Sequence, residues 1–218
     1  MWHDAVYRLL DVTSAIDAEA GQEVQALEWR WRVSVPAAVR EWVVGDWRYW
    51  KAGKHIDYAP NTATLRQLAP TGREARFLVI DEDGQGCCAF VVAVDEGDDP
   101  PVYLIGPDDT AAESRSLHAR SFTEYALATV WDSKQHEDGG GRWAFSRALP
   151  PGALPWLGER LQRLPRTFGW AGNRPCEVVH RFTGRADVLL AVSGDEIHHS
   201  HVNGADRAFV EQIADLSR

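Results

Sequence analysis

Residues 79–94 read VIDEDGQGCCAFVVAV, and this stretch places three acids, two glycines and two adjacent cysteines between apolar runs. A short acidic, glycine-containing segment between two strand-like runs is typical of a β-hairpin turn. The stretch therefore predicts a hairpin that joins a strand ending near Ile80 to a strand starting at Cys87. The same residue types also occur in calcium, phosphate and redox sites, and spacing distinguishes those sites from a turn.

The spacing does not fit a calcium loop or a phosphate loop. An EF-hand loop that starts at Asp81 matches the motif at its third, fifth and sixth positions. Its twelfth position, which must supply a bidentate Glu, is Val92. The Gly-Gln-Gly segment is too short for a phosphate loop, and the acids around it would repel phosphate. The segment 81–86 is therefore predicted to be a structural turn.

The chain has three cysteines, Cys87, Cys88 and Cys176, which do not make a disulfide framework. Adjacent side chains on a strand point to opposite faces, so Cys87 and Cys88 are poorly placed to pair with each other. We expect all three to be reduced side chains that fill small spaces.

The rest of the chain alternates between helical and strand patterns. Ser34 before Pro36 is a helix start, and Ser121 with Glu124 forms a capping-box pattern. Residues 46–72 have weak periodicity and predict a long loop, and residues 136–142 (HEDGGGR) could separate two domains or form a loop within one. The predicted strands are 75–80, 87–94, 102–105, 177–182, 187–192 and 197–202, and the predicted helices are 1–16, a segment ending near 31, 36–45, 121–131, 154–164 and 206–216.

The acidic residues are concentrated in one segment. The net charge is −9, and residues 81–114 contain ten acids but no Lys or Arg, whereas the rest of the chain has 22 acids against 23 bases. Such a segment would repel nucleic acid and attract a basic partner, and the alternative is a set of solvated turns. The ten acids are Asp81, Glu82, Asp83, Asp95, Glu96, Asp98, Asp99, Asp108, Asp109 and Glu113.

Three histidines near the C-terminus raise the possibility of a metal site. On a strand, His199 and His201 share a face and His198 takes the other. Two such histidines can bind zinc if a third ligand approaches, and the alternative is a polar strand face. Candidate third ligands from neighbouring segments are His180, Asp187 and Asp195. No serine or cysteine nucleophile motif is present, so no catalytic residue is assigned.

The composition is that of an ordinary soluble protein, with 44% hydrophobic and 25% charged residues. The first residues do not resemble a signal peptide, and no apolar stretch approaches the length of a membrane span. We therefore expect a cytoplasmic protein with no membrane association and no cofactor. Ten tryptophans are unusual, and a few exposed ones would suit a partner surface.

Three motifs occur in order between residues 24 and 131. The first is LEWRWRVSVPAAVREWV, in which Leu27 and Glu28 lie in a helix pattern, Val35-Pro36 follows, and Trp42 belongs to the next helix. The second is the turn at 81–86 followed by an apolar strand and by Asp-Asp-Pro-Pro-Val at 98–102. The third is SFTEYAL, which begins at Ser121.

Together these motifs resemble the SUKH superfamily, which includes bacterial toxin-immunity proteins and a yeast cell-wall regulator. The resemblance implies an α+β fold with a mixed, mostly antiparallel sheet and helices packed on one side. We expect one domain over residues 1–218, because the strands and helix at 177–216 resemble the tail of longer bacterial members. The resemblance also implies a non-enzymatic protein that binds a protein partner, possibly a basic toxin domain such as a nuclease, and that does not bind nucleic acid.

The expected partner surface combines the acidic segment with aromatic residues near the long loop. Charge would supply a fast association rate, and buried aromatics would supply most of the affinity. Two other functions stay open: a regulatory scaffold or small-ligand module on the same fold, and a metal-dependent hydrolase that uses the His198–His201 cluster. The aromatic candidates, for which core packing is the alternative, are Trp42, Trp47, Tyr49 and Trp50.

Overall fold

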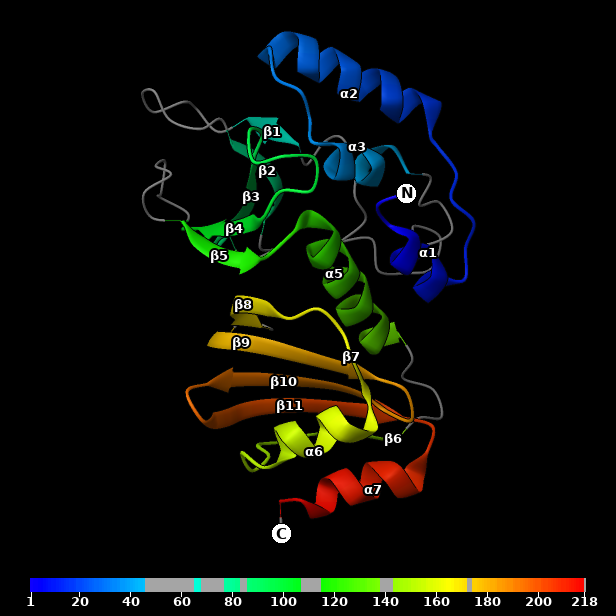
Figure 1. Cartoon of the computed structure of the whole chain (residues 1–218), viewed down its shortest axis with the longest axis vertical. Helices are drawn as coiled ribbons and strands as arrows, with labels where there is room; N and C mark the ends of the chain where they lie inside the picture. The colour runs from blue at the N-terminus through cyan, green and yellow to red at the C-terminus, as the bar shows by residue number, and fades with distance from the viewer. Residues whose placement is uncertain are drawn as a thin grey trace. The chain divides into compact units, whose positions relative to one another are not determined.

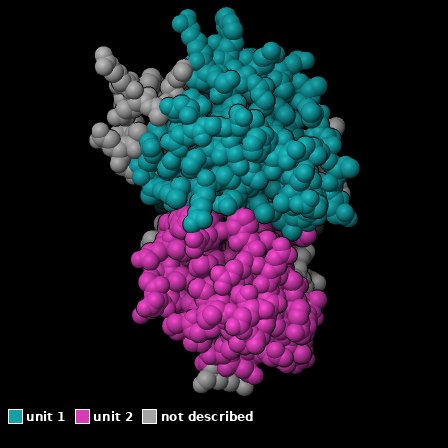
Figure 2. Space-filling model, in the orientation of Figure 1, with its two compact units in different colours: residues 1–130 teal, residues 131–218 magenta. Residues whose placement is uncertain are grey.

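The structure is a computed structural model, and it describes residues 1–45, 65–67, 77–82, 86–106, 115–137, 143–171 and 174–217 (Figure 1). The chain divides into two compact units, residues 1–130 and residues 131–218, which Figure 2 shows in separate colours. The boundary falls within helix α5 (Phe122–Glu137). Among the described residues, no helix is both long and apolar enough to cross a membrane.

Unit 1 contains a five-stranded antiparallel sheet whose strands lie in chain order (Figure 1). Strands β2 and β3 form the predicted hairpin around the acidic turn, with Leu78 opposite Val92. A β-bulge between Val79 and Asp81 shifts the register where β2 approaches this turn. The strands are β1 (Arg66–Gln67), β2 (Phe77–Glu82), β3 (Ala89–Ala93), β4 (Val102–Ile105) and β5 (Ser116–Ala119).

The helices of unit 1 cover one face of this sheet. Alternate strand residues such as Leu78, Val92 and Val102 form one buried cluster with apolar residues of the helices. The opposite alternation, which includes Val79 and Val91, forms a separate buried cluster. The helices that contribute to the first cluster are α1 (Asp4–Leu10), α2 (Ala18–Trp31), α3 (Ala37–Val44) and the start of α5.

Local sequence signals fix the ends of these helices. Asp17 caps α2 by accepting from the backbone N–H groups of Glu19 and Ala20, at 3.0 and 3.3 Å. Arg32 ends α2 in the left-handed conformation, and Pro36 precedes the first turn of α3. The helix pattern predicted to end near Trp31 and the helix predicted to follow Pro36 are therefore confirmed. The helix predicted over 1–16 is shorter, because Asp11 takes a left-handed conformation after Leu10.

Unit 2 contains a second antiparallel sheet with helices α6 (Ala153–Arg160) and α7 (Arg207–Asp215) on one face. On the other face, the guanidinium of Arg181, which is only 4% exposed, donates to both carboxylate oxygens of Asp132 and to the Thr167 hydroxyl. The sheet runs in the order β6 (Trp143–Ser146), β11 (Glu196–Gly204), β10 (Asp187–Ser193), β9 (Arg174–Thr183) and β7 (Gln162–Arg163), and β8 (Thr167–Ala171) also pairs with β9.

The predicted α+β class and the antiparallel pairing are confirmed. The strands form two sheets instead of the one sheet expected, because β9, β10 and β11 pair with one another and with β6, β7 and β8. The expectation of a single domain over residues 1–218 stays a prediction, and the motifs at 24–131 fall almost entirely in unit 1. Most of the predicted loop at 46–72 lies outside the described residues, although residues 66 and 67 form β1.

Candidate functional site

The net charge of the chain resides in one unit. Residues 1–130 contain 21 acids against 12 Lys and Arg, a net charge of −9, whereas residues 131–218 contain 11 of each. A surface of unit 1 is therefore the place to look for a basic partner. The acids of this segment that the structure describes lie at the end of β2 and in the turn between β3 and β4. Their carboxylates differ in their hydrogen-bond partners.

The β3–β4 turn, residues 94–101, is tied to two helices. The backbone carbonyl of Asp98 accepts from the N–H of Ala38 in the first turn of α3, at 2.8 Å. The carboxylate of Asp99 accepts from the N–H of Thr123 at the start of α5, also at 2.8 Å. A carboxylate at a helix N-terminus satisfies an unpaired donor and interacts favourably with the helix dipole. Asp99 is therefore a structural anchor of the turn.

Glu96 is held by a cluster at the base of the same turn. Its carboxylate accepts from the Tyr103 hydroxyl at 2.7 Å and lies 3.5 Å from the Arg115 guanidinium. That guanidinium lies over the rings of Tyr103 and Phe77, with centroid distances of 4.7 and 5.1 Å. Burial, and then the Glu96 carboxylate, raise the pKa of Tyr103, so its hydroxyl keeps its proton and continues to donate.

Asp81 also has an internal role. Its carboxylate accepts from the hydroxyl of Tyr125 at 2.8 Å and from the backbone N–H of Glu82. Burial and the neighbouring Asp81 charge raise the pKa of Tyr125 well above its ordinary value. This bond links β2 to α5, and so the first acid of the turn at 81–86 stabilises the core of unit 1. Glu82, which follows it, is exposed.

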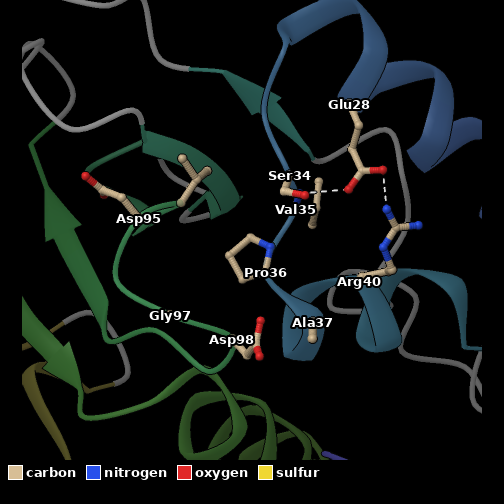
Figure 3. Close-up of a pocket in the computed structure, with 10 residues that line it drawn as sticks. Glu28, Ser34, Val35, Pro36, Ala37, Arg40, Asp95, Gly97 and Asp98 are labelled. Carbon is tan, nitrogen blue, oxygen red and sulfur yellow. Dashed lines mark hydrogen bonds and ion pairs between the residues drawn. The ribbon is translucent and has the colours of Figure 1, made fainter.

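A pocket of about 350 Å³ lies where the α2–α3 connection meets the β3–β4 turn (Figure 3). The connection and its flanking helices supply one wall, and the turn supplies the other. The lining residues are Glu28, residues 34–37 and Arg40 on the helical side, and Val94, Asp95, Gly97 and Asp98 on the side of the turn.

Glu28 organises the helical wall. One of its carboxylate oxygens accepts from the Val35 N–H at 2.8 Å, and the other pairs with the guanidinium of Arg40 (Figure 3). The Glu28 side chain is only 16% exposed, and the adjacent Arg40 guanidinium balances its charge where little water can do so. The pair holds the connection at residues 32–36 between α2 and α3.

The carboxylates of Asp95 and Asp98 stand apart from the other acids. Both residues are exposed, and neither carboxylate makes a hydrogen bond or ion pair with another residue in the described ranges. Figure 3 shows the Asp98 carboxylate beside Pro36 and Ala37, while the Asp95 side chain extends from the other end of the turn. These two are the acids of the turn that are available to a partner.

Trp42 is a correction to the predicted partner surface. It is only 6% exposed and packs against the rings of His3 and Phe122, with centroid distances of 5.0 and 6.3 Å. It belongs to the core because it lies on the same face of α3 as Val39 and Val43. The other predicted aromatics, Trp47, Tyr49 and Trp50, and the predicted acids Asp83, Asp108 and Asp109 lie outside the described residues.

The aromatic that α2 presents to solvent is Trp29, which is 86% exposed and was not among the predicted partner residues. Helical spacing contains the signal for it. Val24, Leu27 and Trp31 lie on the face of α2 that packs against the core, and Trp29 falls on the other side of that helix. Ser34 and Arg40, which line the pocket, carry no comparable signal, because their positions depend on how α2 and α3 pack.

The histidines of β11 are arranged as predicted, and of the candidate third ligands Asp187 lies on their face of the sheet, where it accepts from the Thr183 hydroxyl at 2.7 Å. His199 and His201 share one face of the strand, because they lie opposite Ala191 and Leu189. His180 pairs with Leu190 and therefore occupies the other face of the sheet. Among the residues that the structure describes, no group of three or more His, Cys, Asp or Glu could hold a metal ion. Cys87, Cys88 and Cys176 form no disulfide with one another.

No protein-family model, no curated protein and no solved structure matches this chain. The motifs of the sequence and the geometry of unit 1 are therefore the observations that bear on function.

Proposed function

We propose that this chain is a SUKH-like, non-enzymatic binding protein that neutralises a basic toxin domain by direct contact. The observation that carries the proposal is the β3–β4 turn, which presents the unpaired carboxylates of Asp95 and Asp98 beside a pocket. The motifs at 24–131 support it, since they include Glu28, Pro36 and the Asp-Asp-Pro-Pro turn that line or flank this pocket.

The charge distribution supports a basic partner. Toxins that cleave nucleic acid are basic because they engage phosphates. A unit with a net charge of −9 attracts such a domain over a distance of about one Debye length, about 8–10 Å, and raises the association rate. The same charge repels nucleic acid itself, so a protein partner is favoured over a nucleic acid.

The rigidity of the turn supports tight binding. Bonds from Ala38 and Thr123 hold the backbone of Asp98 and the side chain of Asp99, so the turn does not have to be ordered when a partner arrives. Preorganisation of this kind reduces the entropic cost of association. We also place the protein in the cytoplasm, in keeping with three cysteines that are not joined by a disulfide.

The test is the rate at which the full chain associates with a basic toxin domain, which is sought first among the products of the neighbouring genes. The structure selects Asp95→Asn with Asp98→Asn, because Asp99 and Glu96 also stabilise the fold and would confound the result. We expect the association rate constant to fall about tenfold at low ionic strength and the salt dependence to weaken.

The matched control is Asp195→Asn with Glu196→Gln, which removes two exposed charges from the turn between β10 and β11 in unit 2. This control should associate at the wild-type rate. Equal rates for both double variants, or no complex with the basic domain, contradict the proposed function.

A further inference from the structure

The pocket beside the β3–β4 turn has the size of a site for one side chain. Its volume of about 350 Å³ is near the lower end of the range for ligand pockets, which is about 300–1,000 Å³. An extended cofactor does not fit such a volume, whereas a single long side chain from a protein partner does.

The lining of the pocket is apolar in the middle and charged at the edges. Val35, Pro36, Ala37 and Val94 supply aliphatic surface, and Figure 3 shows the ring of Pro36 at the centre of the labelled residues. An aliphatic chain placed over this surface removes apolar area from water. The occupant is therefore expected to have an apolar stem.

The charges at the edges select a cation as the head of that stem. The charge of Glu28 is balanced by Arg40, and its other oxygen is occupied by the Val35 N–H. The carboxylates of Asp98 and Asp95 have no such partner, so the lining as a whole carries a net negative charge. An anion is repelled, and a neutral side chain leaves the carboxylate charge without compensation.

We infer that this pocket seats an arginine side chain of the basic partner, with the stem against Pro36 and the guanidinium at the Asp98 carboxylate. A guanidinium is favoured over an ammonium because it is planar, is less strongly hydrated and can donate two parallel hydrogen bonds to a carboxylate. This inference rests on the proposed function, since it names the chemistry by which the partner is recognised.

The test titrates the full chain with N-acetyl-arginine-N′-methylamide and follows backbone amide resonances by NMR. We expect saturable shifts at Val35, Ala37 and Gly97, with a dissociation constant on the order of millimolar for so small a probe. The matching citrulline compound, which has nearly the same shape but no charge, should cause no saturable shift. The lysine compound should bind more weakly than the arginine compound.

The Asp98→Asn variant should weaken binding of the arginine probe at least about fivefold. This substitution keeps the backbone carbonyl that accepts from Ala38, so the turn stays in place. The Asp195→Asn variant in unit 2 serves as the control and should bind the probe like the wild type. Absence of shifts, equal binding of the citrulline compound, or an unchanged affinity in Asp98→Asn overturns the inference.

These outcomes are separable from those of the association experiment, because the probe titration needs no partner. If the toxin domain associates with the expected charge dependence but the arginine probe does not bind, the pocket inference fails alone. If the probe binds but no basic domain associates, the proposed function fails.

Discussion

Two acidic hairpin turns in this protein look alike in sequence but differ in how they are held. The β3–β4 turn of unit 1 contains Asp95, Glu96, Asp98 and Asp99, and it is bonded to α3, to α5 and to the Tyr103–Arg115 cluster. The β10–β11 turn of unit 2 contains Asp195, Glu196 follows it as the first residue of β11, and the Gly194 N–H donates to Glu177 on β9 at 2.9 Å.

Under the proposed function, the difference implies that acidity alone does not make a recognition surface. In the first turn, some carboxylates stabilise the backbone so that others are presented to solvent at fixed positions beside a pocket. In the second, the exposed acids adjoin a short hairpin connection whose Gly194 N–H donates to Glu177. Charges that are held in place before binding contribute more to recognition than charges that must be ordered on binding, and the bonds from Ala38 and Thr123 hold the first turn in this way.

The largest stability effect is expected for Glu28→Ala. This substitution leaves the buried Val35 N–H and the Arg40 guanidinium without their partner, which should lower the free energy of unfolding by about 2 kcal/mol. Chemical denaturation measures the change, and amide hydrogen exchange at Val35 reports the local opening.

Glu177→Ala is the control for this prediction, because Glu177 also accepts from a backbone N–H but is exposed. The expected loss for the control is below about 1 kcal/mol. Equal losses for the two variants would show that Glu28 stabilises the α2–α3 wall of the pocket no more than Glu177 stabilises the β10–β11 turn.

A smaller effect is expected for Asp99→Ala. The N–H of Thr123 at the start of α5 loses its acceptor, and substitutions of capping residues typically cost about 1 kcal/mol. Ser121 still accepts from Glu124, so the helix start is weakened but not lost. Chemical denaturation measures the free energy of unfolding of Asp99→Ala, with Asp195→Ala as the control. A loss of unfolding free energy in Asp195→Ala as large as that in Asp99→Ala would contradict the prediction.

The effect expected to be smallest near neutral pH is a pH dependence of stability that originates at His3, which contacts Ala38 of α3. Burial lowers the pKa of His3, whose ring Nε2 lies 2.8 Å from the carbonyl of Ala38, the same residue that donates to Asp98. Because the pKa of His3 is lower in the folded chain, around and below its ordinary pKa of about 6.5 the unfolded chain binds more protons at this residue than the folded chain does. Stability is therefore present above this pH and is lost as the pH falls, by at most about 1.4 kcal/mol per pH unit.

The measurement is the free energy of unfolding between neutral and mildly acidic pH, for the wild type and for His3→Gln. Burial also lowers the pKa of His180 in unit 2, so the difference between the two curves isolates the contribution of His3. If the two curves of unfolding free energy against pH are parallel, His3 does not contribute to the pH dependence of stability.

Local patterns predicted much of the secondary structure. The end of α2 near Trp31, the start of α3 after Pro36 and the hairpins around 81–86 and 94–101 follow from periods of 3.6 and 2 and from turn residues. The short strands β1, β5, β6, β7 and β8 were missed, since their two to five residues lack the continuous apolar run that marks β3 and β4. The division into two sheets was missed because strand pairing connects residues far apart, such as Phe145 and Val202.

The sequence by itself determined the helix and hairpin positions in unit 1 and the concentration of negative charge there, since both depend on residues that are near one another in the chain. Only the tertiary structure decided which carboxylates are available to a partner. Asp81 is bonded to Tyr125, 44 residues away, and Asp99 to Thr123, 24 residues away. The folded arrangement alone brings these donors within hydrogen-bond distance, and it leaves Asp95 and Asp98 exposed beside the pocket.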